Sequence, residues 1–135
     1  MAVFYAILIQ PYLDEILSGI KTVDSRFTKN RIAPYKKVKI GDILYFKLSG
    51  GLVYGKAEVE KVLYFDELTP AKVKSIFDQY NTQIRARLEF IEQKLTSEYA
   101  TLMWLTNVTR VTPFAVEHHG QSSWFQVESG LKKWI

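Results

Sequence analysis

The first strongly apolar segment of the chain runs from Val3 to Ile9. Its β-branched and aromatic residues are apolar on both alternating faces, which is typical of a strand inside a sheet. Pro11 can occupy the first position of a helix, and apolar residues then recur at helical spacing, at Tyr12, Leu13, Ile16 and Leu17. Gly19 follows them, and glycine is common just after the last turn of a helix. The pattern predicts a buried strand followed by a short helix.

A second alternating segment, Thr22 to Phe27, follows directly. If it is a strand, its two-residue period places Asp24 and Arg26 on the same face, with Thr22 beside them. Lys21 directly precedes this strand, and its long side chain can reach the face that carries Asp24 and Arg26. One carboxylate and two cations are therefore expected to meet there.

The middle of the chain predicts a loop and a hairpin. Residues 28–39 contain a proline and have no clear period, so we expect a loop. Ile43–Leu48 is predicted to be a strand, and the sequence Ser49-Gly50-Gly51 after it is a hairpin signal. The partner strand alternates from Val53, and the break in its alternation at Glu60-Lys61 predicts a bulge.

Helices and further strands are expected in the second half. Thr69 followed by Pro70 begins one helix, and a second helix follows with an apolar stripe of Ile84, Leu88, Ile91 and Leu95. Strand character returns from Tyr99 to Val111 and is expected to end at Pro113, and a last short strand lies within 122–127. This order predicts one α+β domain over residues 1–135, a small mixed β-barrel decorated by about three helices.

Composition narrows the class of protein. A chain of 135 residues with 47% hydrophobic residues is long enough for one domain with its own core. The absence of cysteine excludes disulfides, thiolate metal sites and cysteine nucleophiles. The apolar N-terminal run is too short to span a membrane, which takes about 20 residues, so we expect a soluble cytoplasmic protein.

No cofactor or metal is expected from the motifs. The sequence has no Gly-rich phosphate loop and no dinucleotide fingerprint. The adjacent His118 and His119 would point in opposite directions in a strand, and no third ligand follows at a suitable spacing. We interpret this histidine pair as part of a solvated loop.

Positive charge is concentrated in one window. The net charge is +4, but residues 21–39 alone carry +6 and the rest of the chain −2. The cations of this window are Lys21, Arg26, Lys29, Arg31, Lys36, Lys37 and Lys39. Such a cluster favours phosphates or other anions, although a solvated loop that keeps the protein soluble has the same composition.

The sequence Gly19-x-Lys21-x-x-Asp24-x-Arg26 resembles the Gly-x-Lys-x-x-Glu-x-Arg motif of the ASCH domains, which belong to the PUA-like superfamily. The segment from Lys39 to Phe46, with its Gly-Asp pair, is also similar to the family, as are the later strands at 53–62 and 105–108. The resemblance covers most of the chain. It implies a β-barrel whose motif lines a cleft for RNA or nucleotide-like ligands.

The motif departs from the family at one position, because Asp24 stands where the family has glutamate. Aspartate keeps the charge but is one methylene shorter, so its contacts must be rearranged. Some relatives of this class are amidohydrolases of N4-acetylcytidine that use a lysine and a threonine three residues later. Lys21 matches that lysine, but Asp24 occupies the threonine position, which favours binding over this reaction. Other relatives have been linked to RNA cleavage.

The resemblance and the charges lead to two functional hypotheses. In the first, the domain binds RNA or a nucleotide, with Gly19, Lys21, Asp24 and Arg26 forming the site. Tyr45 and Trp124 are candidates to stack on an unpaired base, and the basic patch, Lys29, Arg31, Lys36, Lys37 and Lys39, would extend the contact to the backbone.

In the second hypothesis the domain is a hydrolase acting on a modified nucleoside or on RNA, with Lys21 and Asp24 as the catalytic pair. A lysine near an arginine has a lowered pKa and can act as a base. Two structural interpretations stand beside these hypotheses: an ion-paired brace inside the barrel, and an ordinary surface ion pair worth less than about 1 kcal/mol.

Overall fold

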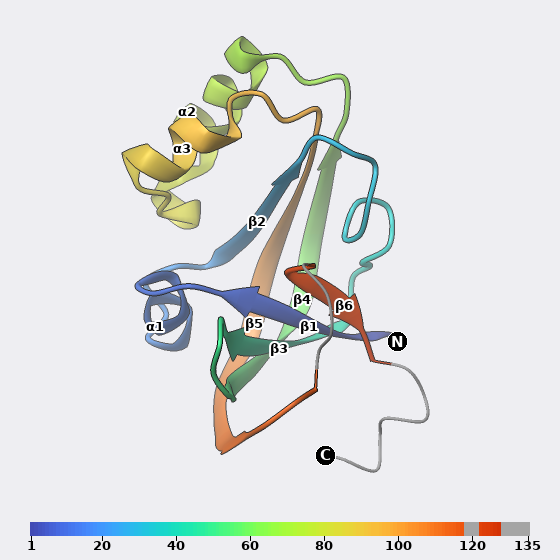
Figure 1. Cartoon of the computed structure of the whole chain (residues 1–135), viewed down its shortest axis with the longest axis vertical. Helices are drawn as coiled ribbons and strands as arrows, with labels where there is room; N and C mark the ends of the chain where they lie inside the picture. Colours follow the sequence, from blue (N-terminus) through green and yellow to red (C-terminus); the bar gives the residue numbers. More distant parts are fainter. Residues whose placement is uncertain (118–121, 128–135) are drawn as a thin grey trace.

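Six strands form one mixed sheet in the computed structural model, which describes residues 1–117 and 122–127. The sheet order is β2-β5-β4-β3-β1-β6, and only β1 and β3 pair in parallel (Figure 1). The strands are β1 Val3–Leu8, β2 Val23–Thr28, β3 Ile43–Leu48, β4 Val53–Phe65, β5 Tyr99–Phe114 and β6 Trp124–Gln126. The helices are α1 Tyr12–Leu17, α2 Pro70–Ile84 and α3 Leu88–Lys94.

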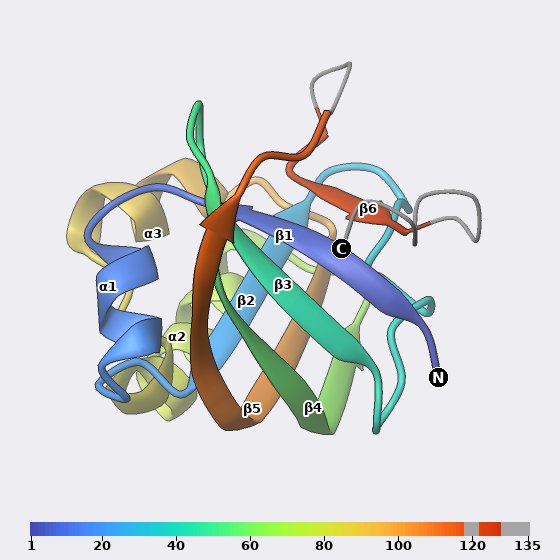
Figure 2. The same ribbon diagram turned by 90° about the horizontal axis from the view of Figure 1, so that it is seen from below.

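The sheet curves into a half-barrel with the three helices gathered on one side (Figure 2). This confirms the predicted α+β fold, a mixed barrel decorated by helices. The long strands β4 and β5 contain 13 and 16 residues, and their pairing is interrupted by three register shifts. One shift lies between Val59 and Lys61, where the broken alternation predicts a bulge. Such bulges let long strands bend around a core.

Local signals place the first two helices correctly. Gly19, with φ of +85°, follows α1, and this left-handed backbone conformation suits glycine. The Thr69 side chain accepts a hydrogen bond from the Lys72 N–H and caps α2. These contacts confirm the predicted end of the first helix and the predicted start of the second.

Three details of the sequence prediction are wrong. The expected second helical stripe is divided, because Ile84 ends α2 and Leu88 is 67% exposed at the start of the short α3. The strand predicted to end at Pro113 continues through it, since β5 extends to Phe114. Pro113 lies beside a register shift between β4 and β5, where the absence of a proline N–H does not interrupt the pairing of the two strands. Thr22 is exposed ahead of β2, and its N–H donates to the Gln83 carbonyl, so it does not share the face of the motif.

The core has two parts. One fills the curve of the sheet and includes Phe4, Leu44 and Phe46. The other lies between α2 and the edge of the sheet, where the rings of Phe27 and Phe77 stack at 4.7 Å. Trp104 and Trp124 belong to the second and first parts respectively.

The helices of residues 1–117 and 122–127 are all too short or too polar to cross a membrane.

Candidate ligand-binding cleft

A cleft of about 550 Å³ lies along the edge strand β2. It is bounded by the end of β1, by α1, by the loop at residues 32–34, by α3 and by residues 122–124 ahead of and within β6. The motif side chains Lys21, Asp24 and Arg26 all line it. This volume lies within the range of pockets that hold small ligands, about 300–1,000 Å³.

Asp24 and Arg26 form a buried, bidentate ion pair in the cleft. Arg26 Nε and Nη2 donate to the two carboxylate oxygens of Asp24 at 2.8 and 3.0 Å. The side chains are only 11% and 1% exposed, so the interpretation as an ordinary surface pair is wrong. The strand period had predicted that the two residues share a face, and this is confirmed.

Arg26 also joins parts of the sheet that are distant in sequence. Its Nη1 donates to the carbonyl oxygens of Ile7 at 3.1 Å and Ser123 at 3.4 Å, and to Ser123 Oγ at 3.3 Å. It thereby connects β2 to β1 and to the start of β6, the other edge of the sheet. Because the guanidinium is committed to these acceptors, it holds the wall of the cleft together and has little donor capacity for a ligand.

Lys21 is buried beside this pair, with only 4% of its surface exposed. Its ammonium donates to the Ile84 carbonyl and lies 5.4 Å from the centre of the Tyr12 ring. Burial lowers the pKa of Lys21 to about 8, since it disfavours the charged form, and Arg26 acts in the same direction while Asp24 opposes it. Lys21 therefore loses its proton at a lower pH than an ordinary lysine.

Trp124 forms another part of the wall and is 4% exposed. The Arg26 guanidinium carbon lies 5.2 Å from the centre of its ring, and Phe4 packs at 5.5 Å. Its indole nitrogen is buried without a hydrogen-bond partner. Trp124, a candidate to stack on an unpaired base, therefore lies in the wall of the cleft with the Arg26 guanidinium near its ring.

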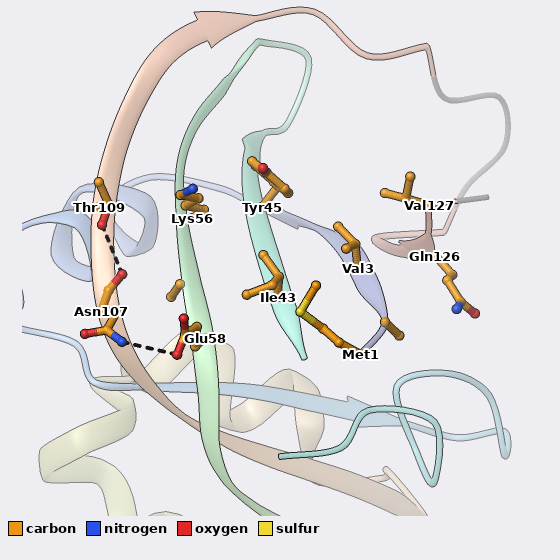
Figure 3. A pocket seen from close by; sticks show the side chains of 12 residues that line it. Met1, Val3, Ile43, Tyr45, Lys56, Glu58, Asn107, Thr109, Gln126 and Val127 are labelled. Carbon is orange, nitrogen blue, oxygen red and sulfur yellow. Dashed lines mark hydrogen bonds between the residues drawn. The ribbon is translucent and has the colours of Figure 1, made fainter. Parts of the chain in front are cut away.

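Gly19 and Tyr45 do not line the cleft. Gly19 is exposed in the turn after α1, which leads the chain to Lys21. Tyr45 faces away from the barrel core, since its neighbours along β3 point inward, and it lines a second cavity of about 820 Å³. Figure 3 shows Tyr45 there beside Val3 and Ile43.

The basic patch lies beside the cleft but outside its walls. Its five members, Lys29, Arg31, Lys36, Lys37 and Lys39, are exposed on the loop between β2 and β3. The same loop supplies an apolar wall through Ile32, Ala33 and Pro34. Arg31 and Lys36 lie 5.5 and 5.9 Å from the centre of the Tyr35 ring. The patch and part of the cleft wall therefore belong to the same loop.

Lys94 lines the cleft and was not predicted from the sequence. It makes no ion pair within the described residues, and its ammonium lies 5.2 Å from the centre of the Phe90 ring. Burial and the nearby Arg26 lower the pKa of Lys94. One sequence signal could have linked Lys94 to its neighbour: Phe90 and Lys94 are four residues apart, a spacing that places both on one side of a helix.

Within residues 1–117 and 122–127, no group of three or more His, Cys, Asp or Glu side chains is arranged to hold a metal ion. The His118-His119 pair lies outside the described residues.

Comparison with known proteins identifies the fold. No family model and no curated protein match the sequence. Among solved structures, the ASCH protein of Zymomonas mobilis superposes with a TM-score of 0.75 at 15% identity, covering 97% of this chain and 91% of that one. Its serine-to-alanine variant superposes with a TM-score of 0.76 at 15% identity, covering 97% of this chain and 92% of that one. Its tyrosine-to-phenylalanine variant superposes with a TM-score of 0.75 at 16% identity, covering 97% of this chain and 94% of that one.

The chain therefore has the same fold as these solved ASCH structures. The resemblance drawn from the Gly19 to Arg26 motif is confirmed at the level of structure.

Proposed function

We propose that this domain binds RNA or a nucleotide-like ligand in the cleft beside β2. The observation that carries the proposal is the combination of a cleft of about 550 Å³ with two lysines, Lys21 and Lys94, that form no ion pair with any carboxylate of the described residues. The fold shared with the ASCH protein of Zymomonas mobilis supports this function only by analogy of fold.

The charges of the cleft support an anionic or partly anionic ligand. Arg26 is balanced by its contact with Asp24, so the two together add no net charge to the wall. Lys21 and Lys94 remain as positive groups in a partly desolvated place, where attraction to a phosphate is stronger than in water. The exposed basic patch next to the cleft extends the positive field to neighbouring phosphates.

Lys94→Gln is expected to weaken the binding of short single-stranded RNAs several-fold at low salt. Loss of one phosphate contact lowers the slope of log affinity against log salt by about 0.7 for a single strand. The measurement is a fluorescence titration at several salt concentrations. Lys74→Gln, on the exposed side of α2, is the matched control and should bind like the wild type. Absence of binding at low ionic strength, or affinity independent of salt, would contradict the proposal.

One observation favours hydrolysis as a second candidate function. Lys21 has a pKa of about 8 in the cleft, which suits a general base near neutral pH. Asp24 is a weaker candidate for the other catalytic role, because both its oxygens accept hydrogen bonds from Arg26.

Under this candidate function, the purified domain hydrolyses N4-acetylcytidine or RNA, and Lys21→Ala reduces the rate by at least 100-fold, the contribution typical of general base catalysis. Product release is followed by chromatography. Turnover that survives in Lys21→Ala would place the reaction elsewhere in the protein or in a contaminant.

A further inference from the structure

We propose that the cavity of about 820 Å³ around Tyr45 is a second ligand site, and that it binds a nucleotide whose base is guanine. The Glu58 carboxylate accepts from the N1–H and the 2-amino group of guanine, the base stacks on the Tyr45 ring, and Lys56 contacts the phosphate. No described residue lines both this cavity and the cleft beside β2, so the inference goes beyond the proposed function.

The first support is the register of the sheet, which brings an aromatic ring, an ammonium and a carboxylate together. Lys56 and Glu58 are exposed on β4 and alternate with buried residues, so their side chains point away from the core, as that of Tyr45 does. Tyr45 pairs with Lys56, and Ile43 with Glu58, across β3 and β4. Directly opposite side chains in neighbouring strands have Cβ atoms about 4.5–5.5 Å apart. One small ligand can therefore contact all three groups (Figure 3).

The second support is the Glu58 carboxylate, which is oriented but not neutralised. Asn107 Nδ2 donates to Glu58 Oε2 at 3.2 Å, as Figure 3 shows. The backbone of Asn107 is itself held in place, because the Thr109 hydroxyl donates to its carbonyl oxygen at 3.1 Å. Glu58 forms no ion pair within residues 1–117 and 122–127. A carboxylate has about four lone-pair sites, so this one contact leaves both oxygens able to accept from a ligand.

The third support is the way in which a carboxylate discriminates among bases. Guanine is the RNA base that presents two adjacent donors, N1–H and the 2-amino group, so it can donate two parallel hydrogen bonds to one carboxylate. Adenine and cytosine present an acceptor beside their amino group, and uracil presents one donor between two acceptors. The Glu58 carboxylate would repel these acceptors, which makes the site selective as well as attractive for guanine.

The Tyr45 ring provides a supported surface on which a base can stack. Its centre lies 5.7 Å from that of Tyr5 and 5.9 Å from that of Phe114, while the residue stays partly exposed. Lys56, beside it, is exposed and forms no ion pair within the described residues. Stacking on the base and attraction of an ammonium for the phosphate act on separate parts of one nucleotide, so both contacts can form together.

The test compares the binding of GMP, IMP and AMP by calorimetry. GMP is expected to bind the wild type about tenfold more tightly than AMP, a discrimination typical of one bidentate pair. IMP lacks the 2-amino group and should bind with intermediate affinity. Glu58→Gln keeps the size of the side chain but sets an amide donor against the donors of guanine, so it should lose about tenfold for GMP and bind the three nucleotides alike.

Two control variants separate this inference from the proposed function. Glu60→Gln changes an exposed carboxylate of β4 that does not line the cavity, and should bind GMP like the wild type. Lys94→Gln, in the cleft, should keep the preference for GMP even where it weakens the binding of RNA. If the wild type does not distinguish GMP from AMP, or Glu58→Gln retains the preference, the second site is overturned and the proposed function stands. If the preference is lost in Lys94→Gln, the nucleotide binds in the cleft and the second site is likewise overturned.

A second measurement locates the nucleotide without changing the cavity. The Asn107 side-chain amide signals of the ¹⁵N-labelled wild type are assigned through Asn107→Gly, since glycine suits the φ of +52° at this position. Saturation with GMP should shift these signals, because Asn107 contacts the carboxylate that accepts from the base. Asn107 signals that stay unchanged at saturation would overturn the inference.

Discussion

Arg26→Ala is expected to lower the free energy of unfolding by about 3–5 kcal/mol, the usual cost of removing one partner from a buried ion pair. The variant leaves the Asp24 carboxylate 1% exposed and without its two-pronged partner. It also removes the donor that connects β2 to Ile7 and Ser123. Urea unfolding at pH 7 measures the loss.

Two variants test whether the geometry of the pair accounts for this loss. Arg26→Lys keeps the charge but cannot form the planar fork, so an intermediate loss is expected. Arg85→Ala breaks an ion pair with Glu15 in which the arginine is 41% exposed, and should cost less than about 1 kcal/mol. A loss in Arg26→Ala as small as in Arg85→Ala would show that the pair does not stabilise the wall of the cleft.

The stability of the wild type relative to Lys21→Met is expected to increase by about 3 kcal/mol as the pH rises from 8 to 10.5. The pKa of Lys21 falls from 10.5 to about 8 on folding because burial disfavours its charged form. Between these two values the unfolded chain binds the extra proton, so stability rises with pH. Below pH 8 both states are protonated and the full cost of the buried charge is present.

Unfolding by urea across this pH range measures the difference, and subtraction of the two curves removes titrations common to both proteins. Lys37→Met, in the exposed loop, controls for the loss of one positive charge from a basic protein. A difference between wild type and Lys21→Met that does not vary from pH 7 to 10.5 would mean that the ammonium is hydrated in the folded protein, and the case for Lys21 as a base would fall with it.

Arg26→Ala and Lys21→Met also test the interpretation that the motif is an ion-paired brace inside the barrel. The structure assigns the brace geometry to Asp24 and Arg26, whose groups satisfy one another. Lys21 differs, since its burial is costly and its direct contacts are a carbonyl and a ring. A residue that costs stability and faces a cavity is more readily explained by ligand binding or catalysis than by folding.

Much of the fold follows from local patterns in the sequence. The alternation through β2 placed Asp24 and Arg26 on one face, the Thr69 cap marked the start of α2, and the break near Lys61 marked a bulge. These features depend on a few consecutive residues and on the geometry of a strand or a helix, so the sequence is sufficient to predict them. The motif from Gly19 to Arg26 likewise indicated the ASCH-like fold.

Other features of the site were decided only by the tertiary structure. The sequence could not show that Arg26 is occupied by Asp24 and by Ser123, which is 97 positions away. Nor could it show that Lys94 enters the cleft while Tyr45 faces a different cavity, or that the Trp124 donor is left unpaired. Periodicity determines which way a side chain points from its own element, but its partners depend on how distant elements pack. For this chain the sequence thus determined the alternation of β2, the end of α1, the start of α2 and the motif, and the packing decided which of its groups are free to meet a ligand.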